Sequence, residues 1–176
     1  MRFVDFLKAT VLLSAGSATT LGVITVVAAT RHGSSRLVFI VVGWWFVAAI
    51  VGAVLGRRAQ ASPPIARLLA EAKPARFLPE HRPGSVLVNR LWPLLGSTVL
   101  AGGLAVVAPQ IPGIATGFAI IWALGWRRQD LAVLAIEERD GATFYVEQTS
   151  PVRPMQLVRT PGFRREVPNL NGSSEA

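Results

Sequence analysis

Four blocks of apolar residues without a single charged side chain dominate this sequence. They cover about residues 9–30, 37–55, 91–108 and 111–126. A helix needs about 20 apolar residues to cross a hydrocarbon core of about 30 Å. A non-helical segment would leave backbone N–H and C=O groups without hydrogen-bond partners in lipid, which is energetically too costly. We therefore predict an all-α membrane protein in which four transmembrane helices form two hairpins within residues 1–128.

The first and fourth blocks each leave an alternative open. The first follows Arg2 and Lys8, as the apolar region of a cleavable signal peptide does, but it is longer than the roughly 7–15 residues of such regions. The fourth has 16 residues and reaches about 24 Å. Either the Pro/Gly-rich turn at 109–113 lies slightly inside the bilayer, or the arginines that follow Trp126 snorkel to the interface.

Positive charge is distributed unevenly around these blocks. Sixteen of the eighteen Lys and Arg residues lie in the N-terminus, in the 57–90 loop or after residue 126, and the two exceptions are Arg31 and Arg36. Because Lys and Arg accumulate on the cytoplasmic side of membrane proteins, we predict a multi-pass protein of the cell (inner) membrane with both termini in the cytoplasm. This distribution accounts for most of the net charge of +8, so no nucleic-acid partner is expected.

The cytoplasmic 57–90 loop contains a helix signal. Ser62 precedes Pro63 and Pro64, an arrangement typical of a helix N-terminus. The apolar residues that follow fall on one helical face: Ile65, Leu68, Leu69 and Ala72. We predict a short amphipathic helix that lies on the bilayer surface, with arginines of the loop near anionic lipid head groups. The alternative is an irregular basic loop.

The segment 129–165 is predicted to be a small β-structured unit, followed by a disordered tail at 166–176. Asp140-Gly141 is a two-residue hairpin turn signal, and a turn centred there places Glu137 opposite Phe144. The alternating sequence MQLVR could add a third strand to a meander. In the alternative, the fourth helix continues to Arg139 and Gly141 caps its C-terminus.

Residues that carry chemistry are scarce. The chain has no cysteine and two histidines, and the four apolar blocks contain no ionisable side chain, which disfavours ion-coupled transport. Nucleotide-binding, metalloprotease and hydrolase signatures are missing. The acidic residues Glu137, Glu138 and Asp140 are contiguous with a tight turn and lack histidine partners, so we interpret them as a solvated turn. We expect no enzymatic activity, no cofactor and no metal.

Glycines and aromatic residues are the positions that we single out. Two G-x-x-x-G patterns provide candidates for helix packing: Gly52, Gly56, Gly113 and Gly117. A second set lies at block ends and is expected to anchor the helices at the membrane interface: Trp92, Trp126, Arg57, Arg58, Arg127 and Arg128. Trp44 and Trp45 lie well inside the second block, where they line a groove, face lipid or join the bundle core.

The combination of glycine-faced helices and absent reactive groups favours a non-enzymatic role. We predict an accessory or scaffold subunit that packs against a membrane protein partner or a second copy of itself. An oligomeric channel or facilitator for a neutral or lipidic solute is the alternative. Sixteen arginines against two lysines are typical of a bacterial genome of high GC content.

Overall fold

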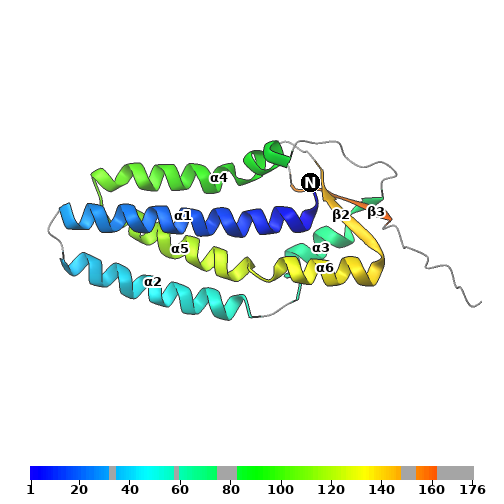
Figure 1. Ribbon diagram of the computed structural model, residues 1–176, viewed down its shortest axis with the longest axis horizontal. Coiled ribbons are helices and arrows are strands. Elements are labelled where there is room, and N and C mark those ends of the chain that lie inside the picture. Colours follow the sequence, from blue (N-terminus) through cyan, green and yellow to red (C-terminus); the bar gives the residue numbers. More distant parts are fainter. Residues whose placement is uncertain (32–34, 58–59, 75–82, 148–153, 162–176) are drawn as a thin grey trace, which may run out of the picture.

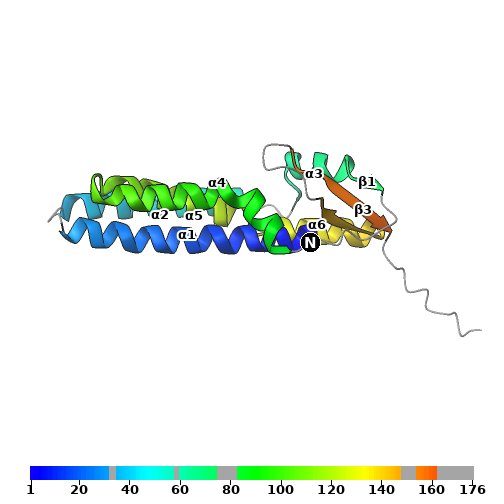
Figure 2. The same ribbon diagram turned by 90° about the horizontal axis from the view of Figure 1, so that it is seen from above.

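The computed structural model describes residues 1–31, 35–57, 60–74, 83–147 and 154–161. It is mostly helical with a small three-stranded sheet. The long helices lie side by side at one end of an elongated molecule and form the helical bundle (Figures 1 and 2): α1 (Phe3–Arg31), α2 (Ser35–Leu55), α4 (Pro83–Gly103) and α5 (Gln110–Trp126). A 3-10 turn, η1 (Leu104–Val106), follows α4.

The shorter elements gather at the other end and form, with the first turns of α1 and α4, a compact region that we call the base. They are α3 (Pro63–Ala70), α6 (Gln129–Asp140), β1 (Lys73–Pro74), β2 (Ala142–Val146) and β3 (Leu157–Pro161). The predicted tail at 166–176 lies outside the described residues.

Two of the bundle helices, α1 and α2, are long and apolar enough to cross a membrane. The helices at the third and fourth predicted spans do not meet the same criteria of length and hydropathy. The helix α5 has 17 residues and extends about 26 Å, which is shorter than a hydrocarbon core of about 30 Å. In α4, Asn89 and Arg90 lower the hydropathy of the first turns.

The helix α5 is the centre of the bundle. It packs against both α1 and α2, while α4 lies along α1 on the opposite side from α2 (Figure 1). The consecutive helices α1 and α2 contact each other far less than each contacts α5. The two predicted hairpins are therefore connected in sequence but are not separate packing units.

The start of α4 differs from the prediction. The third predicted span begins at about residue 91, whereas α4 begins at Pro83 and encloses Pro93. Proline has no N–H to donate to the carbonyl four residues earlier, and its ring clashes there, so it kinks a helix. Both ribbon views show the first turns of α4 displaced from the axis of the remainder. Burial of Val86 in the base explains why the helix starts early.

The base has its own apolar core. Its buried residues come from α1, α3, α4, α6, β2 and β3: Phe3, Val4, Phe6, Leu7, Ile65, Leu69, Val86, Leu91, Val133, Phe144, Val146 and Leu157. The helix α3 forms where Ser62-Pro63-Pro64 predicted it. Its apolar face does not lie on a bilayer, however, because Ile65 and Leu69 are 1% and 8% exposed and pack within this core.

The hairpin predicted around Asp140-Gly141 is wrong. Residues 129–140 form α6, and Gly141 ends that helix with a left-handed φ of 58°, a conformation that glycine adopts without strain at a helix C-terminus. The alternative with Gly141 as a cap is therefore correct, although a turn at Arg127 and Arg128 separates α6 from α5. An αL glycine suits both a hairpin turn and a helix cap. The buried residues of this segment, Gln129, Ala132, Val133 and Glu137, have helical spacing.

The small sheet was predicted only in part. The segment MQLVR does enter a strand, β3, which pairs antiparallel with β2, so that Phe144 opposes Arg159. The second neighbour of β3 is β1, a parallel pairing of Lys73 with Val158 that joins the 57–90 loop to the C-terminal segment. A two-residue strand leaves no periodicity in the sequence, which explains why β1 was missed.

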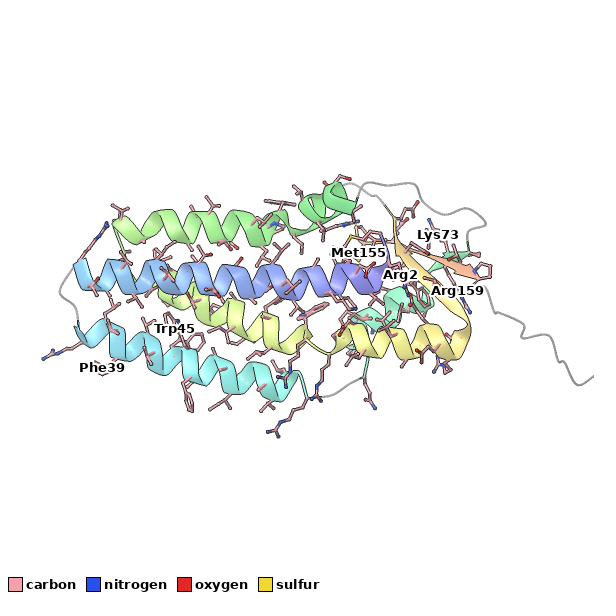
Figure 3. The ribbon with its side chains drawn as sticks, in the orientation of Figure 1. Arg2, Phe39, Trp45, Lys73, Met155 and Arg159 are labelled. Atoms are coloured by element: carbon pink, nitrogen blue, oxygen red, sulfur yellow. The ribbon has the colours of Figure 1, made fainter. Side chains whose placement is uncertain are left out.

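The N-terminus is fastened to the base by polar contacts. The Val146 N–H donates to the Met1 carbonyl at 3.0 Å, which extends the sheet beyond β2. Arg2 Nη2 donates to Glu137 Oε2 at 2.8 Å, and Glu137 Oε1 accepts from the Phe144 N–H at 2.9 Å. Glu137 is 7% exposed, so its assignment to a solvated turn is wrong. The hydrogen bond that Arg2 donates to Glu137 raises the pKa of Arg2. Arg2 lies among the side chains of the base in Figure 3.

Replacing Arg2 tests this contact. Arg2→Gln removes the cation that compensates the buried Glu137 carboxylate, and we expect the free energy of unfolding to fall by about 1–3 kcal/mol, since Arg2 is itself partly solvated. Denaturant unfolding in mild detergent measures the change. The control is Arg139→Gln, because Arg139 also forms a 2.8 Å ion pair but its side chain is 74% exposed. Equal losses in both variants would contradict a structural role for Arg2.

Candidate functional site in the helical bundle

The four candidate packing glycines lie along the contact between α2 and α5, which we call the seam. A Cβ added at Gly52 would lie 2.9 Å from Leu124 Cβ, and one at Gly113 would lie 2.9 Å from Val41 Cγ2. At Gly56 the added atom would meet the Leu124 carbonyl, and at Gly117 the Trp44 indole. The absence of side chains therefore allows the two backbones to approach closely, and the structure brings both G-x-x-x-G patterns together within one chain.

Two indole rings cross the seam and hydrogen-bond to the backbone of α5. Trp44 Nε1 donates to the Ile114 carbonyl at 3.2 Å, and Trp45 Nε1 donates to the Gly113 carbonyl at 2.9 Å. Figure 3 labels Trp45 between α2 and α5. An indole N–H in apolar surroundings needs an acceptor, and the absence of a side chain at Gly117 leaves room for the Trp44 indole. No sequence pattern signalled these contacts beyond the deep position of both tryptophans.

Many hydroxyl groups within the long helices donate to carbonyls of their own helices. Each of the following donates to the carbonyl four residues earlier: Thr10, Ser14, Thr19, Thr20, Thr25, Thr98 and Thr116. Serine and threonine satisfy their donors in this way inside apolar helices. Their hydrogens are therefore committed to the backbone and do not line a polar path.

The outer surface of the bundle is apolar over most of its length. Among the described residues, the large hydrophobic side chains that are more than one third exposed lie, except for Leu131, on α1, α2, α4 and α5 or in the turn after α4. Phe39 and Val107 are 79% and 83% exposed, and Figure 3 shows Phe39 at the edge of α2. Soluble monomers rarely expose more than a few hundred Å² of contiguous apolar surface, so this surface calls for a nonpolar environment.

The candidate interfacial anchors lie around the junction of bundle and base. Trp126 ends α5 and stacks on Trp122 with ring centroids 5.5 Å apart. Arg128 Nη1 donates to the Arg57 carbonyl at 3.1 Å, which ties the end of α5 to the end of α2. The remaining anchors are on the surface or undescribed: Trp92 and Arg127 are exposed, and Arg58 lies outside the described residues.

Side chains that could take part in catalysis or metal binding are few in the described segments. These segments contain no group of three or more His, Cys, Asp or Glu side chains that could hold a metal ion. Both histidines, His32 and His81, lie outside the described residues. The arrangement that remains is one of close helix packing and apolar exposure.

Comparisons with protein-family models, with curated proteins and with solved structures find no match to this chain. Similarity to known proteins therefore assigns neither a family nor an activity, and the geometry of the bundle and the base is the basis for the proposal that follows.

Substitutions at two glycines test the seam. In Gly117→Ala the new methyl group overlaps the Trp44 indole, and we expect overpacking to cost about 1–3 kcal/mol of unfolding free energy. In Gly43→Ala, also within a helix, nothing lies within 4 Å of the new atom, so stability should be unchanged or slightly higher. Thermal unfolding in detergent compares the two. A Gly117→Ala variant as stable as Gly43→Ala would show that the seam is not closely packed.

Proposed function

We propose that this protein is a multi-pass membrane protein with four transmembrane helices and cytoplasmic termini, and that it serves as a non-enzymatic accessory subunit. The observation that carries the proposal is the concentration of exposed apolar surface on the bundle, among the described residues. If lipid surrounds the bundle and water surrounds the base, the exposed apolar side chains are removed from water without any change of fold.

Exposure on α4 and α5 supports four spans. Val99 and Leu100 on α4 are 75% and 65% exposed, and Ile114 and Phe118 on α5 are 50% and 60% exposed. These fractions are similar to those on α1 and α2, so the same medium suits all four helices. The shortness of α5 is compatible with crossing, because Arg127 and Arg128 at its end have long side chains that can snorkel to the interface.

The fastening of the N-terminus supports the proposed orientation. Since Arg2 pairs with Glu137 of α6, the N-terminus and the base lie on one side, as an even number of spans requires. The base carries cations such as Arg67, Lys73 and Arg159, whereas Arg31 and Arg36 flank the opposite end of the bundle. Such an excess favours the cytoplasmic side. The packing of Phe3 and Leu7 into the base core also favours retention of α1 over its removal as a signal peptide.

Outward-facing small residues support a partner in the membrane. The seam uses Gly52, Gly56, Gly113 and Gly117 within the chain, so these glycines are not available to another protein. By contrast, Gly16 on α1 and Gly96 on α4 are exposed and have nothing within 4 Å of an added Cβ. Small exposed residues let a second helix approach closely. The proposed partner is therefore a transmembrane helix of another protein or of a second copy.

Cysteine labelling tests the orientation in a chain that has no cysteine of its own. We expect Arg31→Cys to react with a membrane-impermeant maleimide in intact spheroplasts, and Glu138→Cys to react only after permeabilisation, because the two positions lie on opposite sides of the bilayer. The cysteine-free parent controls for background labelling. Labelling of Glu138→Cys alone from outside would refute the proposed topology.

Photocrosslinking in the native membrane tests the partner. A benzophenone amino acid replacing Thr20, on the open face of α1, should give a discrete species of higher mass because a partner helix lies against that face. The control position is Phe39 on α2, which is 79% exposed and faces lipid in this proposal. Mass spectrometry distinguishes another protein from a second copy. A protein that gives no product from position 20 and runs as a monomer in mild detergent is not an accessory subunit.

The second candidate is an oligomeric channel or facilitator for a neutral or lipidic solute. It is favoured by a hollow of about 480 Å³ between α1, α2 and α5, whose lining includes Gly22, Val23, Trp45 and Thr116 and contains no charged residue. Glycerol flux into liposomes that contain only this protein separates the two roles, since an accessory subunit would leave the flux at that of empty liposomes.

A further inference from the structure

A groove at the junction of bundle and base combines an apolar lining with one cation. It lies between α1, α4 and α5, has a volume of about 440 Å³, and is lined by residues that include Phe6, Arg90, Leu94, Ser97, Trp122 and Trp126. This volume falls in the range of about 300–1,000 Å³ that is typical of small-molecule sites. We call it the Arg90 groove.

Arg90 supplies the charge of this groove. Among the described residues that line the groove, Arg90 is the one with a charged side chain. Arg90 is partly buried, its Nη2 donates to the Pro154 carbonyl at 3.4 Å, and desolvation by burial lowers its pKa. A guanidinium that has lost part of its hydration gains from an anionic oxygen that enters the groove, because charge-assisted hydrogen bonds replace those to water.

The rest of the lining is suited to a hydrocarbon chain. Trp122 and Trp126 stack at an interplanar angle of 20° and form one wall. The hydroxyls of Thr10 and Ser97 donate to the carbonyls of Phe6 and Leu94, so they are satisfied within their own helices. The lining beside Arg90 therefore offers few free hydrogen-bond donors to a ligand, as a hydrocarbon chain requires.

The kink of α4 helps to shape the groove. Pro93 is part of the lining and lies inside α4, three residues after Arg90. Because proline displaces the first turns of the helix from its axis, the segment with Arg90 and the segment with Leu94 and Ser97 meet at an angle. By contrast, the hollow between α1, α2 and α5 has no charged residue in its lining.

We propose that the Arg90 groove binds one anionic phospholipid, with the phosphate at Arg90 and an acyl chain along Leu94 and Trp122. The inference rests on the proposed membrane embedding, in which Arg90 immediately precedes the third span and Trp126 ends the fourth, so that the groove opens at the level of the cytoplasmic head groups. Charge complementarity selects an anionic lipid, and the apolar lining selects an amphiphile over a free anion.

Tryptophan quenching by brominated lipids tests the proposal on the full chain. The protein is reconstituted into phosphatidylcholine nanodiscs that contain a small fraction of lipid with brominated acyl chains, as either phosphatidylglycerol or phosphatidylcholine. We expect more quenching by brominated phosphatidylglycerol, saturating at a low mole fraction, because a bound acyl chain would lie beside Trp122 and Trp126. Equal quenching by the two lipids would overturn the proposal even if cysteine labelling supports the topology.

Paired variants separate a defined site from general attraction to a basic protein. In Arg90→Gln, the preference for phosphatidylglycerol should weaken roughly fivefold, whereas Arg127→Gln, which removes an exposed cation outside the groove, should retain it. Loss of the preference in both variants would indicate diffuse electrostatics and refute the site. Should Arg90→Gln fail to fold, Ser97→Phe fills the groove from an exposed position, and Val99→Phe is its control outside the lining. Equal preference in these two variants would likewise refute the site.

Discussion

Close approach of α2 to α5 is the constraint on which the bundle depends. Backbone contact at this distance is possible because glycines stand at the crossing, and any Cβ at Gly56 or Gly117 would overlap the facing helix. The absence of a side chain at Gly117 also makes room for Trp44, which donates to a carbonyl of α5, as Trp45 does. In apolar surroundings an unsatisfied indole N–H is costly, so packing and polar satisfaction are achieved by the same residues.

The base depends on the bundle through α1. The first turns of this helix supply Phe3, Val4 and Leu7 to the base core, while its later turns pack against α5. Glu137 of α6 joins the N-terminus to β2 by accepting from Arg2 and from the Phe144 N–H. Because one continuous helix belongs to both regions, a movement of the bundle would be transmitted to the sheet.

Part of this structure was predicted from sequence, and the errors have physical causes. Helical periodicity and length located the long helices and α3, and the two G-x-x-x-G patterns pointed to residues that meet at the seam. The hairpin at Asp140-Gly141 was wrong because an αL glycine suits a turn and a helix cap alike. Glu137 was taken as solvated because its partner Arg2 is 135 residues away in the chain. The Arg90 groove involves three helices and left no local pattern.

The sequence alone determined that the chain has long uncharged apolar segments with its cations mostly outside them, because hydropathy and charge are properties of local composition. It also predicted the helical character of those segments, since a helix pairs its own backbone within an apolar segment. Only the tertiary structure decided that the glycines serve α2 and α5 of the same chain, that α3 is buried in the base and that Arg90 overlooks an apolar groove. Those outcomes depend on which surfaces meet, and residues far apart in sequence carry no local signal of their contact.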